Sequence, residues 1–585
     1  MTDILFVNSA DKLTINEEVN GTMLLGTLLL QADFHVQILR FAQLKTKPRQ
    51  YAEFIREITG RILEIAPKCV SFYTLWSYYH IMLRVAAEIK KANPSIIVVF
   101  AGPHASTCAE ATMQAMPFVD YVCSGEGENT VVPFFRALLR EENADLSQIP
   151  GLYYRQGETI LCNTDRAPVC NLNALPYWDE RLYPDAYDES DEMRRSPDYF
   201  MPIDVGRGCP FSCTFCSASR FWKRLYRLKS PERIVDEIQY YMEKFGITSF
   251  WFTHDAFTVN KKLVADVCNY ILEKNLNIRW RCSSRVDCLS EDLILLMKKA
   301  GLVGIELGIE TGSPRMQKLV NKNLDLQNAE KTISFLLSND ITVYLFFMYG
   351  FPEETEEDLN QTMELHFSWL DLGVTYASMS YCMFTPDTVM TDRFYDQLQW
   401  KPDMPAIQRL VLGHTEEHDM LLQNKILFSD YYHLHTPVRD NYHYLYLLSQ
   451  VYQNVPHLGR YIRRLYQGDN LKFYHDFVEQ NQLLLDEKLN AIQTHIGDYA
   501  AQMMGNVLNK FDLPYIPLLK EALRFDADRI KVFRSKENIS MTETYNFCYL
   551  DYQRKRPIEQ YTQGATTIYI QNIDGKKGMR ILDMK

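Results

Sequence analysis

The chain of 585 residues carries a formal net charge of −12, with 46% hydrophobic and 23% charged residues. Domains usually have about 100–200 residues, so we expect three or four of them. The acidic balance argues against a nucleic acid partner, which would need a basic stripe. No basic region or cleavage site accompanies the apolar run Ile4–Val7, and no apolar stretch near it approaches the about 20 residues that span a bilayer. We therefore expect a cytoplasmic protein without a membrane span.

The thirteen cysteines are scattered from Cys69 to Cys548, and only three of them lie close together in the sequence. An odd number of mostly isolated cysteines in a long chain indicates reduced thiols rather than a disulfide framework. Most of them are expected to be small buried hydrophobic residues. The group of three requires a separate explanation.

Residues 1–140 alternate short apolar runs with amphipathic stretches. This alternation, with strands that are apolar throughout, predicts a doubly wound, Rossmann-like α/β domain with a parallel sheet. A ligand of such a sheet binds beyond the carboxyl ends of its strands, where the strand order reverses. The expected strands are Ile4–Val7, Val36–Phe41, Cys69–Tyr73, Ile96–Ala101 and Tyr121–Cys123.

Small, polar and aromatic residues follow these strands where each one ends. Glycine at such a position lets the backbone approach a flat, bulky ligand, and a helix N-terminus can accept its phosphate. From physical chemistry alone, a nucleotide, a flavin or cobalamin would suit the site equally. The candidate ligand-binding residues are Asn8, Ser9, Tyr73, Thr74, Leu75, Trp76, Gly102, Pro103, His104, Gly125, Glu126, Gly127 and Glu128.

Residues 141–200 are expected to form a connector, with a hairpin around Gln156-Gly157 and a linker from Leu175 to Asp198 that is rich in Pro, Asp and Tyr. Residues 201–400 show a second alternation of strands and helices, which is typical of a partial (β/α) barrel with its functional groups at the carboxyl ends of the strands. The expected strands are Pro202–Val205, Ser249–Thr253, Arg279–Ser283, Gly304–Leu307, Val343–Met348 and Ala377–Met383.

Residues 401–585 differ from the preceding part in being rich in Tyr, Leu, Gln and Asn. Helical periodicity runs through Leu445–Tyr466 and Leu471–Ala500, whereas the last stretch, Thr566–Met584, has strand character. We expect a mostly helical C-terminal domain that closes the mouth of the barrel and sets specificity. Its Tyr-rich helices could equally serve packing alone.

The three neighbouring cysteines are Cys209, Cys213 and Cys216, in a C-x₃-C-x₂-C spacing that follows a predicted strand. A [4Fe–4S] cluster is commonly held by four cysteines, so three of them leave one iron open to another ligand. A structural zinc site would need a fourth ligand, and no Cys or His follows until His254. The spacing therefore favours a catalytic iron–sulfur cluster. Unpartnered core cysteines are the remaining alternative.

This spacing, with the aromatic Phe215 before the last cysteine, resembles the radical S-adenosylmethionine (SAM) superfamily. The resemblance implies that the three cysteines hold a [4Fe–4S] cluster whose open iron chelates the amino and carboxylate groups of SAM. It also implies that an electron from the cluster breaks the sulfonium, and that a 5′-deoxyadenosyl radical then abstracts hydrogen from a substrate. An electron donor such as flavodoxin or ferredoxin is implied as a partner.

Later segments resemble the barrel strands of the same family in order and spacing, over about residues 200–390. His254 stands where the family often has the first of two acids, so only Asp255 is assigned to the SAM amine. Taken singly, Arg285 could form a surface ion pair, Gly350 and Pro352 a tight turn, and Glu310 an ordinary helix cap. The residues that the resemblance implies near SAM are Phe215, Asp255, Ser283, Arg285, Gly308, Glu310, Gly350 and Pro352.

The strand-end loops of residues 1–140 look like those of the cobalamin (B12)-binding domains that are fused to many radical SAM proteins. The Asp-x-His-x-x-Gly segment found in many cobalamin domains does not follow Val7. The resemblance therefore implies cobalamin bound without a protein histidine on cobalt. Trp76 is a candidate for its lower face, or equally a core aromatic residue.

Together these resemblances imply a cobalamin-dependent radical SAM methyltransferase that acts on an unactivated carbon of a small molecule, natural product or peptide. One SAM would methylate cobalamin, and a second SAM would supply the radical that prepares the substrate. A radical cyclase or ring-rearranging oxidoreductase that uses both cofactors without methyl transfer is the first alternative. The second is a cobalamin-binding sensor or scaffold, which the intact cysteines disfavour. A methylthiotransferase is disfavoured because the N-terminal half lacks grouped cysteines for a second cluster.

Overall fold

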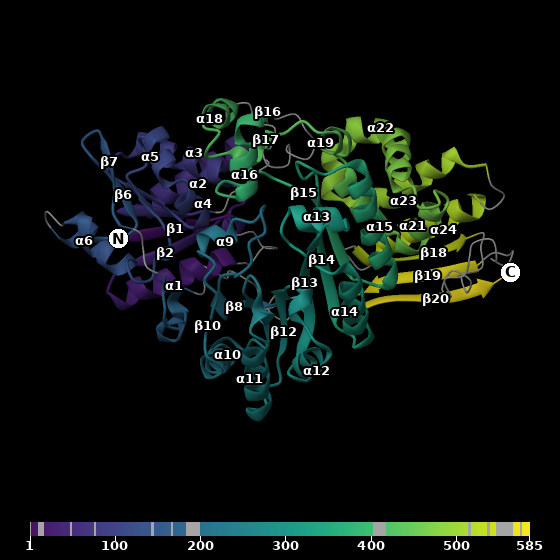
Figure 1. Ribbon diagram of the computed structural model, residues 1–585, viewed down its shortest axis with the longest axis horizontal. Coiled ribbons are helices and arrows are strands. Elements are labelled where there is room, and N and C mark those ends of the chain that lie inside the picture. Colours follow the sequence, from purple (N-terminus) through teal and green to yellow (C-terminus); the bar gives the residue numbers. More distant parts are fainter. Residues whose placement is uncertain are drawn as a thin grey trace. The chain divides into compact units, whose positions relative to one another are not determined.

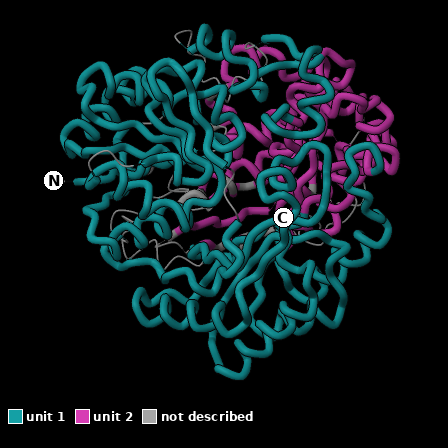
Figure 2. Tube along the Cα trace, turned by 60° about the vertical axis from the view of Figure 1, so that its left-hand side comes forward, with its two compact units in different colours: residues 1–307, 318–342, 383–434 teal, residues 308–317, 343–382, 435–585 magenta. Residues whose placement is uncertain are grey.

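The computed structural model describes residues 2–9, 17–46, 50–74, 78–141, 145–164, 168–182, 199–401, 417–512, 516–534, 539–545, 566–573 and 576–584 (Figure 1). The chain divides into two compact units, which Figure 2 colours separately. The first unit comprises Met1–Leu307, Lys318–Thr342 and Met383–Leu434, and the second comprises Gly308–Gln317, Val343–Cys382 and His435–Lys585.

The N-terminal part of the first unit is built on a seven-stranded sheet of order β2-β1-β3-β4-β5-β6-β7. Its strands are β1 (Ile4–Asn8), β2 (Val36–Arg40), β3 (Cys69–Tyr73), β4 (Ile97–Ala101), β5 (Tyr121–Cys123), β6 (Leu152–Gln156) and β7 (Thr159–Cys162). The first five strands run parallel, and the predicted hairpin adds β6 and β7 antiparallel at one edge. The strand order reverses between β1 and β3, as in doubly wound folds that bind a ligand at that point.

Helices cover both faces of this sheet. They are α1 (Glu17–Gln31), α2 (Tyr51–Ile65), α3 (Tyr79–Ala92), α4 (Pro103–Thr107), α5 (Ala109–Ala115) and α6 (Val131–Arg140). Helix α1 packs with α6, and α2 packs with α3, which is the pairing expected when the chain winds in both directions from β1. Every residue of β1 is buried, so this strand needs no polar face and reads as a continuous apolar run.

The rest of the first unit carries the start of a second β/α series. Strands β8 (Met201–Asp204), β11 (Ser249–Thr253), β12 (Arg279–Ser284) and β13 (Leu302–Glu310) pair in parallel in that order. Helix α10 (Pro231–Phe245) is set by its ends, since Ser230 caps it, proline occupies its first position, and Gly246 ends it with a φ of 66°. The other helices are α11 (Lys261–Glu273), α12 (Glu291–Lys299), α14 (Leu326–Ser338), α16 (Val389–Phe394) and α18 (His418–Gln423).

Three short elements frame the cysteine segment. Strand β9 (Gly206–Arg207) precedes it, the one-turn helix α9 (Ala218–Phe221) follows it, and β10 (Arg227–Leu228) returns to pair antiparallel with β9. Strands β16 (Gln399–Trp400) and β17 (Tyr432–His433) also form an antiparallel pair.

The second unit continues the β/α series with the parallel strands β14 (Thr342–Tyr349) and β15 (Tyr376–Tyr381), with α13 (Pro314–Leu319) and α15 (Glu356–Leu372). A helical part follows, which ends in the antiparallel strands β18 (Ile539–Tyr545), β19 (Thr566–Ile573) and β20 (Lys576–Met584). Its helices are α19 (Pro437–Asn441), α20 (Leu445–Asn454), α21 (Pro456–Arg464), α22 (Asn470–Thr494), α23 (Ile496–Val507) and α24 (Ile516–Arg534).

The fold class predicted from the sequence is confirmed: a doubly wound N-terminal domain, a parallel β/α series and a mainly helical C-terminal part. Within the described ranges, none of the helices combines the length and apolar character that crossing a bilayer requires. Of the predicted linker, residues 183–198 lie outside the described part of the chain.

Candidate active site

The three clustered cysteines lie in the loop between β9 and α9, and all are free thiols. Within the loop, the Cys216 backbone N–H donates to the Cys213 carbonyl at 3.2 Å. Thr214 anchors the loop on both sides, since its N–H donates to Val320 O at 3.0 Å and its carbonyl accepts from Met390 N at 2.9 Å. The loop is therefore held by backbone bonds to segments far away in the sequence.

The electrostatics of the loop suit a cationic centre. Burial raises the pKa of the Cys216 thiol to about 12, and the neighbouring Cys213, Asp255 and Cys209 raise it further. Burial and the nearby Asp255 and Cys213 likewise raise the pKa of Cys209. Neighbouring thiols oppose one another's ionisation, because two like charges would lie close together. A bound metal centre removes this opposition, because a thiol that coordinates a metal is deprotonated. The residues present therefore fit a cluster held by three thiolates.

Gly208, immediately before Cys209, is required by both its conformation and its surroundings. Its φ is +90°, and a Cβ there would lie 1.7 Å from the Leu225 carbonyl oxygen. No side chain fits, so the residue before the first cysteine packs directly on the backbone of the turn that follows α9.

Arg285, a predicted SAM contact, supports the cysteine loop. Its guanidinium lies 3.8 Å over the Phe211 ring and 4.0 Å from the Cys213 sulfur, and it donates to Lys322 O at 2.8 Å. The side chain is buried, so the alternative of a surface ion pair does not describe it, although it also pairs with Asp287 at 2.8 Å.

Two other predicted SAM contacts are Ser283 in β12 and Phe215 in the cysteine loop. Ser283 Oγ donates to Glu306 Oε2 at 2.7 Å. Phe215 is half-buried beside Cys216.

Asp255 and His254 follow β11. The Asp255 carboxylate accepts hydrogen bonds from Gly208 N–H and from the Trp222 indole, and burial raises its pKa. His254 is buried, and its Nδ1 accepts from Ala256 N at 2.9 Å. Burial lowers the pKa of His254 to about 4, so a neutral imidazole occupies the position where the family often has an acid.

A cavity of about 450 Å³ lies within the first unit and is lined from both of its parts. The N-terminal domain contributes Phe6 of β1 and the carboxyl ends of β3, β4 and β5, and the second β/α series contributes Cys216, Trp222, His254 and Asp255. The two parts touch here, since Asn20 Nδ2 donates to Thr253 Oγ1 at 2.9 Å. The cysteine loop and the strand-end loops of the N-terminal sheet therefore face one space.

Most of the predicted cobalamin residues line this cavity, namely Tyr73, Gly102, Pro103, His104, Gly125, Glu126, Gly127 and Glu128. Asn8, Ser9 and Thr74 are buried beside it without lining it. Leu75 and Trp76 lie outside the described residues. The assignment of these residues to cobalamin stays a prediction.

Glycine and histidine shape the strand-end wall of the cavity. Gly102 has a φ of +93°, and a Cβ there would lie 2.9 Å from the Thr74 backbone, so the two loops approach as closely as backbone allows. The next loop residue but one, His104, is buried against Tyr79, with Nε2 2.9 Å from the Leu427 carbonyl. This close-packed cradle of loops fits a large planar ligand.

The carboxylates of Glu126 and Glu128 make a buried ion network with the second part of the unit. Arg207 lies 2.7 Å from both glutamates and 3.0 Å from Asp204, and Arg227 lies 2.8 Å from Glu126. Burial alone would raise the pKa of Glu126, but Arg227 and Arg207 hold it below its ordinary value. Neither arginine was predicted from the sequence as a functional residue.

The remaining predicted SAM residues, Gly308, Glu310, Gly350 and Pro352, belong to the second unit. Glu310 is buried with a φ of +70°, which is unusual for a non-glycine residue. Gly350 also has positive φ, and its N–H donates to Glu354. Burial raises the pKa of Glu354 to about 8, although Gly350 N–H and Phe351 N–H donate to it.

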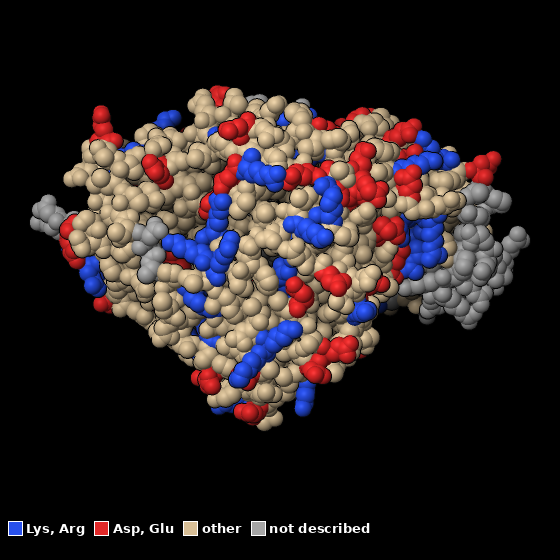
Figure 3. Space-filling model, viewed as in Figure 1, with Lys and Arg blue, Asp and Glu red and all other residues tan. Residues whose placement is uncertain are grey.

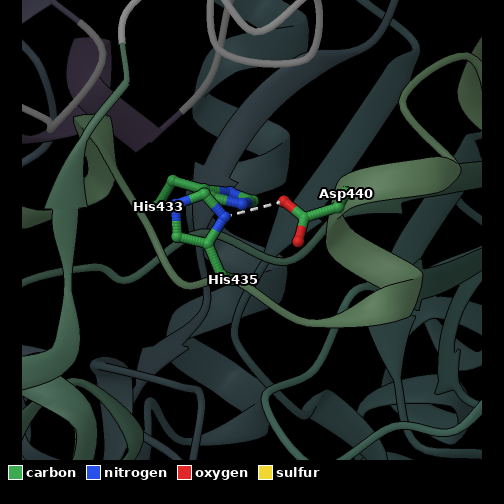
Figure 4. Close-up of side chains that lie close together, drawn as sticks. All are labelled: His433, His435 and Asp440. Atoms are coloured by element: carbon green, nitrogen blue, oxygen red, sulfur yellow. Dashed lines mark hydrogen bonds and ion pairs between the residues drawn. The ribbon is translucent and has the colours of Figure 1, made fainter.

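Arg439 of α19 holds the opposite side of the Gly350 loop. This fully buried guanidinium donates from Nη1 to the carbonyls of Gly350 and Cys382, the latter at 3.0 Å, and lies 4.4 Å over the Tyr381 ring. Helix α19 is short, but Thr436 caps it, and Figure 4 shows Asp440 reaching His435 Nδ1, at 3.1 Å. The loop is thus fixed through its N–H by Glu354 and through its carbonyl by Arg439.

Comparison with known proteins agrees with this arrangement. Residues 203–366 match the radical SAM superfamily, and residues 16–134 match the B12 binding domain. An uncharacterized methyltransferase of Pyrococcus horikoshii is 29% identical over 332 residues, which are 57% of this chain and 70% of that protein. The anaerobic magnesium-protoporphyrin IX monomethyl ester cyclase of Rubrivivax gelatinosus is 25% identical over 323 residues, 54% of this chain and 56% of the cyclase.

Among solved structures, the cobalamin-dependent SAM radical enzyme OxsB, with aqua-cobalamin and SAM bound, is similar in fold. It matches 92% of this chain and 82% of its own with a TM-score of 0.60 and 14% identity. At this identity the likeness concerns the fold alone, and it extends through most of the chain.

Proposed function

Because this chain is a radical SAM superfamily protein with an N-terminal B12-binding domain, we propose that it is a methyltransferase. An enzyme of this kind uses a [4Fe–4S] cluster, SAM and cobalamin. Its proposed substrate is a small molecule or natural product with an unactivated carbon that accepts the methyl group. The observation that carries the proposal is the single cavity lined by the strand-end loops of the B12-binding domain and by Cys216 and Asp255.

A shared cavity is what this chemistry requires. Cluster-bound SAM supplies a substrate-activating radical, and cobalamin supplies a methyl group. Both must reach the same substrate carbon, and the reactive species must be kept from water. Several relatives are named as methyltransferases, the Pyrococcus protein among them, which further supports the proposal.

We assign roles to the residues of the chain on the same basis. Cys209, Cys213 and Cys216 hold the cluster, while Asp255 meets the SAM amine. Asp255 lines the cavity, and a bound ammonium would favour the charged form of its carboxyl group. The further proposed SAM contacts are Phe215, Ser283, Arg285, Gly308, Glu310, Gly350 and Pro352. The thirteen strand-end residues of the N-terminal sheet are proposed to surround cobalamin.

The test measures transfer of the methyl group from SAM to cobalamin, which requires no knowledge of the substrate. The anaerobically reconstituted enzyme, loaded with cobalamin and a strong reductant, is incubated with SAM alone. We expect about one equivalent of S-adenosylhomocysteine per bound cobalamin, since each cobalamin takes one methyl group from SAM. Formation of 5′-deoxyadenosine without S-adenosylhomocysteine would exclude methyl transfer.

A cyclase or other oxidoreductase with both cofactors is the second candidate. The similarity to the anaerobic magnesium-protoporphyrin ester cyclase favours it, because that enzyme matches 54% of this chain. The absence of S-adenosylhomocysteine in the experiment above, together with steady 5′-deoxyadenosine formation, would favour this candidate.

Replacing Arg439 by methionine should weaken SAM binding about tenfold. Removing the guanidinium takes the Arg439 donor away from two buried carbonyls and loosens the Gly350 loop. A loss of about 1.4 kcal/mol in binding free energy corresponds to a factor of ten in affinity. Equilibrium dialysis with radiolabelled SAM measures this effect. Arg463→Met is the matched control in the same unit, since that buried arginine pairs with Glu364 at 2.8 Å and with Asp371 instead. Equal SAM affinity in both variants would contradict the proposed role of the Gly350 loop.

A further inference from the structure

The segment after the cluster cysteines is strongly basic in an acidic protein. Residues 217–229 hold five Lys or Arg and no Asp or Glu, whereas the whole chain carries a net charge of −12. On the face drawn in Figure 3, Lys and Arg side chains gather over the place that α9 holds in Figure 1. A local positive field of this kind attracts an acidic partner that the rest of the molecule would repel.

Most of these charges are engaged inside the fold. Arg220 pairs with Asp387 at 3.0 Å and Asp392 at 2.6 Å, Arg227 pairs with Glu126, and Lys229 pairs with Glu237 at 2.7 Å. Lys223 and Arg224 are exposed at the tip of the turn. The adjoining Leu225 is 42% exposed, so an apolar side chain lies beside the two cations.

The backbone of this turn is fixed in an unfavourable conformation. Lys223 and Arg224 have φ values of +52° and +58°, in the left-handed region that non-glycine residues rarely adopt. Their N–H groups donate to Arg220 O and Ser219 O, both at 2.9 Å. Both residues are exposed, so this turn places two neighbouring cations at the surface.

The turn is also in direct contact with the cluster loop. The Leu225 carbonyl packs against Gly208, the neighbour of Cys209, so closely that no Cβ would fit between them. Trp222, at the start of the turn, lines the cavity and donates to Asp255. Only a few residues of packed backbone therefore separate the exposed tip of the turn from a predicted cluster ligand.

We propose that the turn Lys223–Leu225 is the docking surface for an acidic one-electron carrier protein of the flavodoxin or ferredoxin type. In the step served by this surface, the reduced carrier gives up one electron, the cluster accepts it, and no covalent bond forms or breaks. The proposal rests on the cluster and goes beyond the proposed methyl transfer, so either can fail without the other.

The test compares two reductants on the double charge reversal K223E/R224E. Stopped-flow absorbance follows reduction of the reconstituted cluster by reduced flavodoxin or by dithionite, without substrate or cobalamin. We expect the second-order rate constant with flavodoxin to fall at least about tenfold at low ionic strength and to lose its salt dependence, because steering of this kind raises association rates by 10–10³. The rate with dithionite should stay unchanged, since a small reductant needs no docking surface.

The control is K298E/K299E, which makes the same charge change at the end of α12, whose C-terminus lies toward the opposite end of the strands from the cysteine loop. Its rates should match the wild type with both reductants. An unchanged flavodoxin rate in K223E/R224E would overturn the proposal. A fall by the same factor with both reductants would overturn it too, because the turn would then support the cluster fold rather than a partner. The neutral variant K223Q/R224Q should give an intermediate flavodoxin rate.

Discussion

Replacing Cys213 by alanine should abolish the cluster and all cleavage of SAM. Three thiolates hold the cluster, and two cannot keep four irons in place. Cys213 is also the most buried of the three, and the Arg285 guanidinium lies 4.0 Å from its sulfur. We expect iron and acid-labile sulfide to fall from about four per chain to nearly none. The second readout, 5′-deoxyadenosine formed with dithionite and SAM, should fall to background.

Cys268→Ala is the matched control for this experiment. Cys268 is fully buried in α11, and burial raises the pKa of its thiol to about 12, as it does for Cys216. Its loss removes one sulfur atom from the core and costs stability on the order of 1 kcal/mol, without touching the cluster. A Cys213→Ala protein that still binds about four irons and cleaves SAM would contradict the assignment.

Replacing Arg207 by methionine should destabilise the first unit by about 3–5 kcal/mol, because it leaves buried carboxylates without their shared cation. Three acids depend on this guanidinium, and its side chain is only 11% exposed. Since the network joins the loop after β5 to the strand that leads into Gly208 and Cys209, we expect both cobalamin affinity and cluster content to fall. Thermal unfolding, cobalamin titration and iron content measure the three effects.

Two further variants separate this network from ordinary ion pairs. Arg181→Met breaks a pair with Asp179 in which the arginine is 61% exposed, so its effect on stability should be far smaller than that of Arg207→Met. The triple variant R207M/E126Q/E128Q removes two of the stranded charges and should recover part of the lost stability. If R207M were as mild as R181M, the network would not couple the two parts of the unit.

Local sequence patterns predicted the elements of this fold well where burial is one-sided or complete. Cys69–Tyr73 and Tyr121–Cys123 match β3 and β5 at both ends. Both strands are mainly apolar, as expected of strands that are covered on two faces. The strand β18 was missed, because it is short of apolar residues and polar residues recur along it.

The assignment of segments to units depended on contacts that no local pattern records. The hairpin β6–β7 was expected in a connector, yet it extends the N-terminal sheet. Residues 383–401 and 417–434 were assigned partly to the barrel and partly to the C-terminal domain, yet they belong to the first unit, where Leu427 O contacts His104 Nε2. The contact between Leu427 and His104 joins positions 323 residues apart.

The same limit applies to the site. The cysteine spacing and the strand-end glycines were visible in the sequence because their chemistry depends on residues that are close neighbours in the chain. The pairing of Arg207 with Glu126 and the bond from Arg439 to Gly350 were not, because the partners lie 81 and 89 residues apart. A charged residue in a sequence does not reveal its partner, and only the fold brings these pairs together.

If the cluster and cobalamin occupy one cavity of the first unit, their unpaired electrons lie close together. Electron paramagnetic resonance of the enzyme loaded with cob(II)alamin and a reduced cluster tests this shared cavity most directly. The two unpaired spins should interact, so the cob(II)alamin signal should be broadened or relax faster than in the cluster-free Cys213→Ala protein. A cob(II)alamin signal identical in the two proteins, with both cofactors shown to be bound in the first, would contradict the claim.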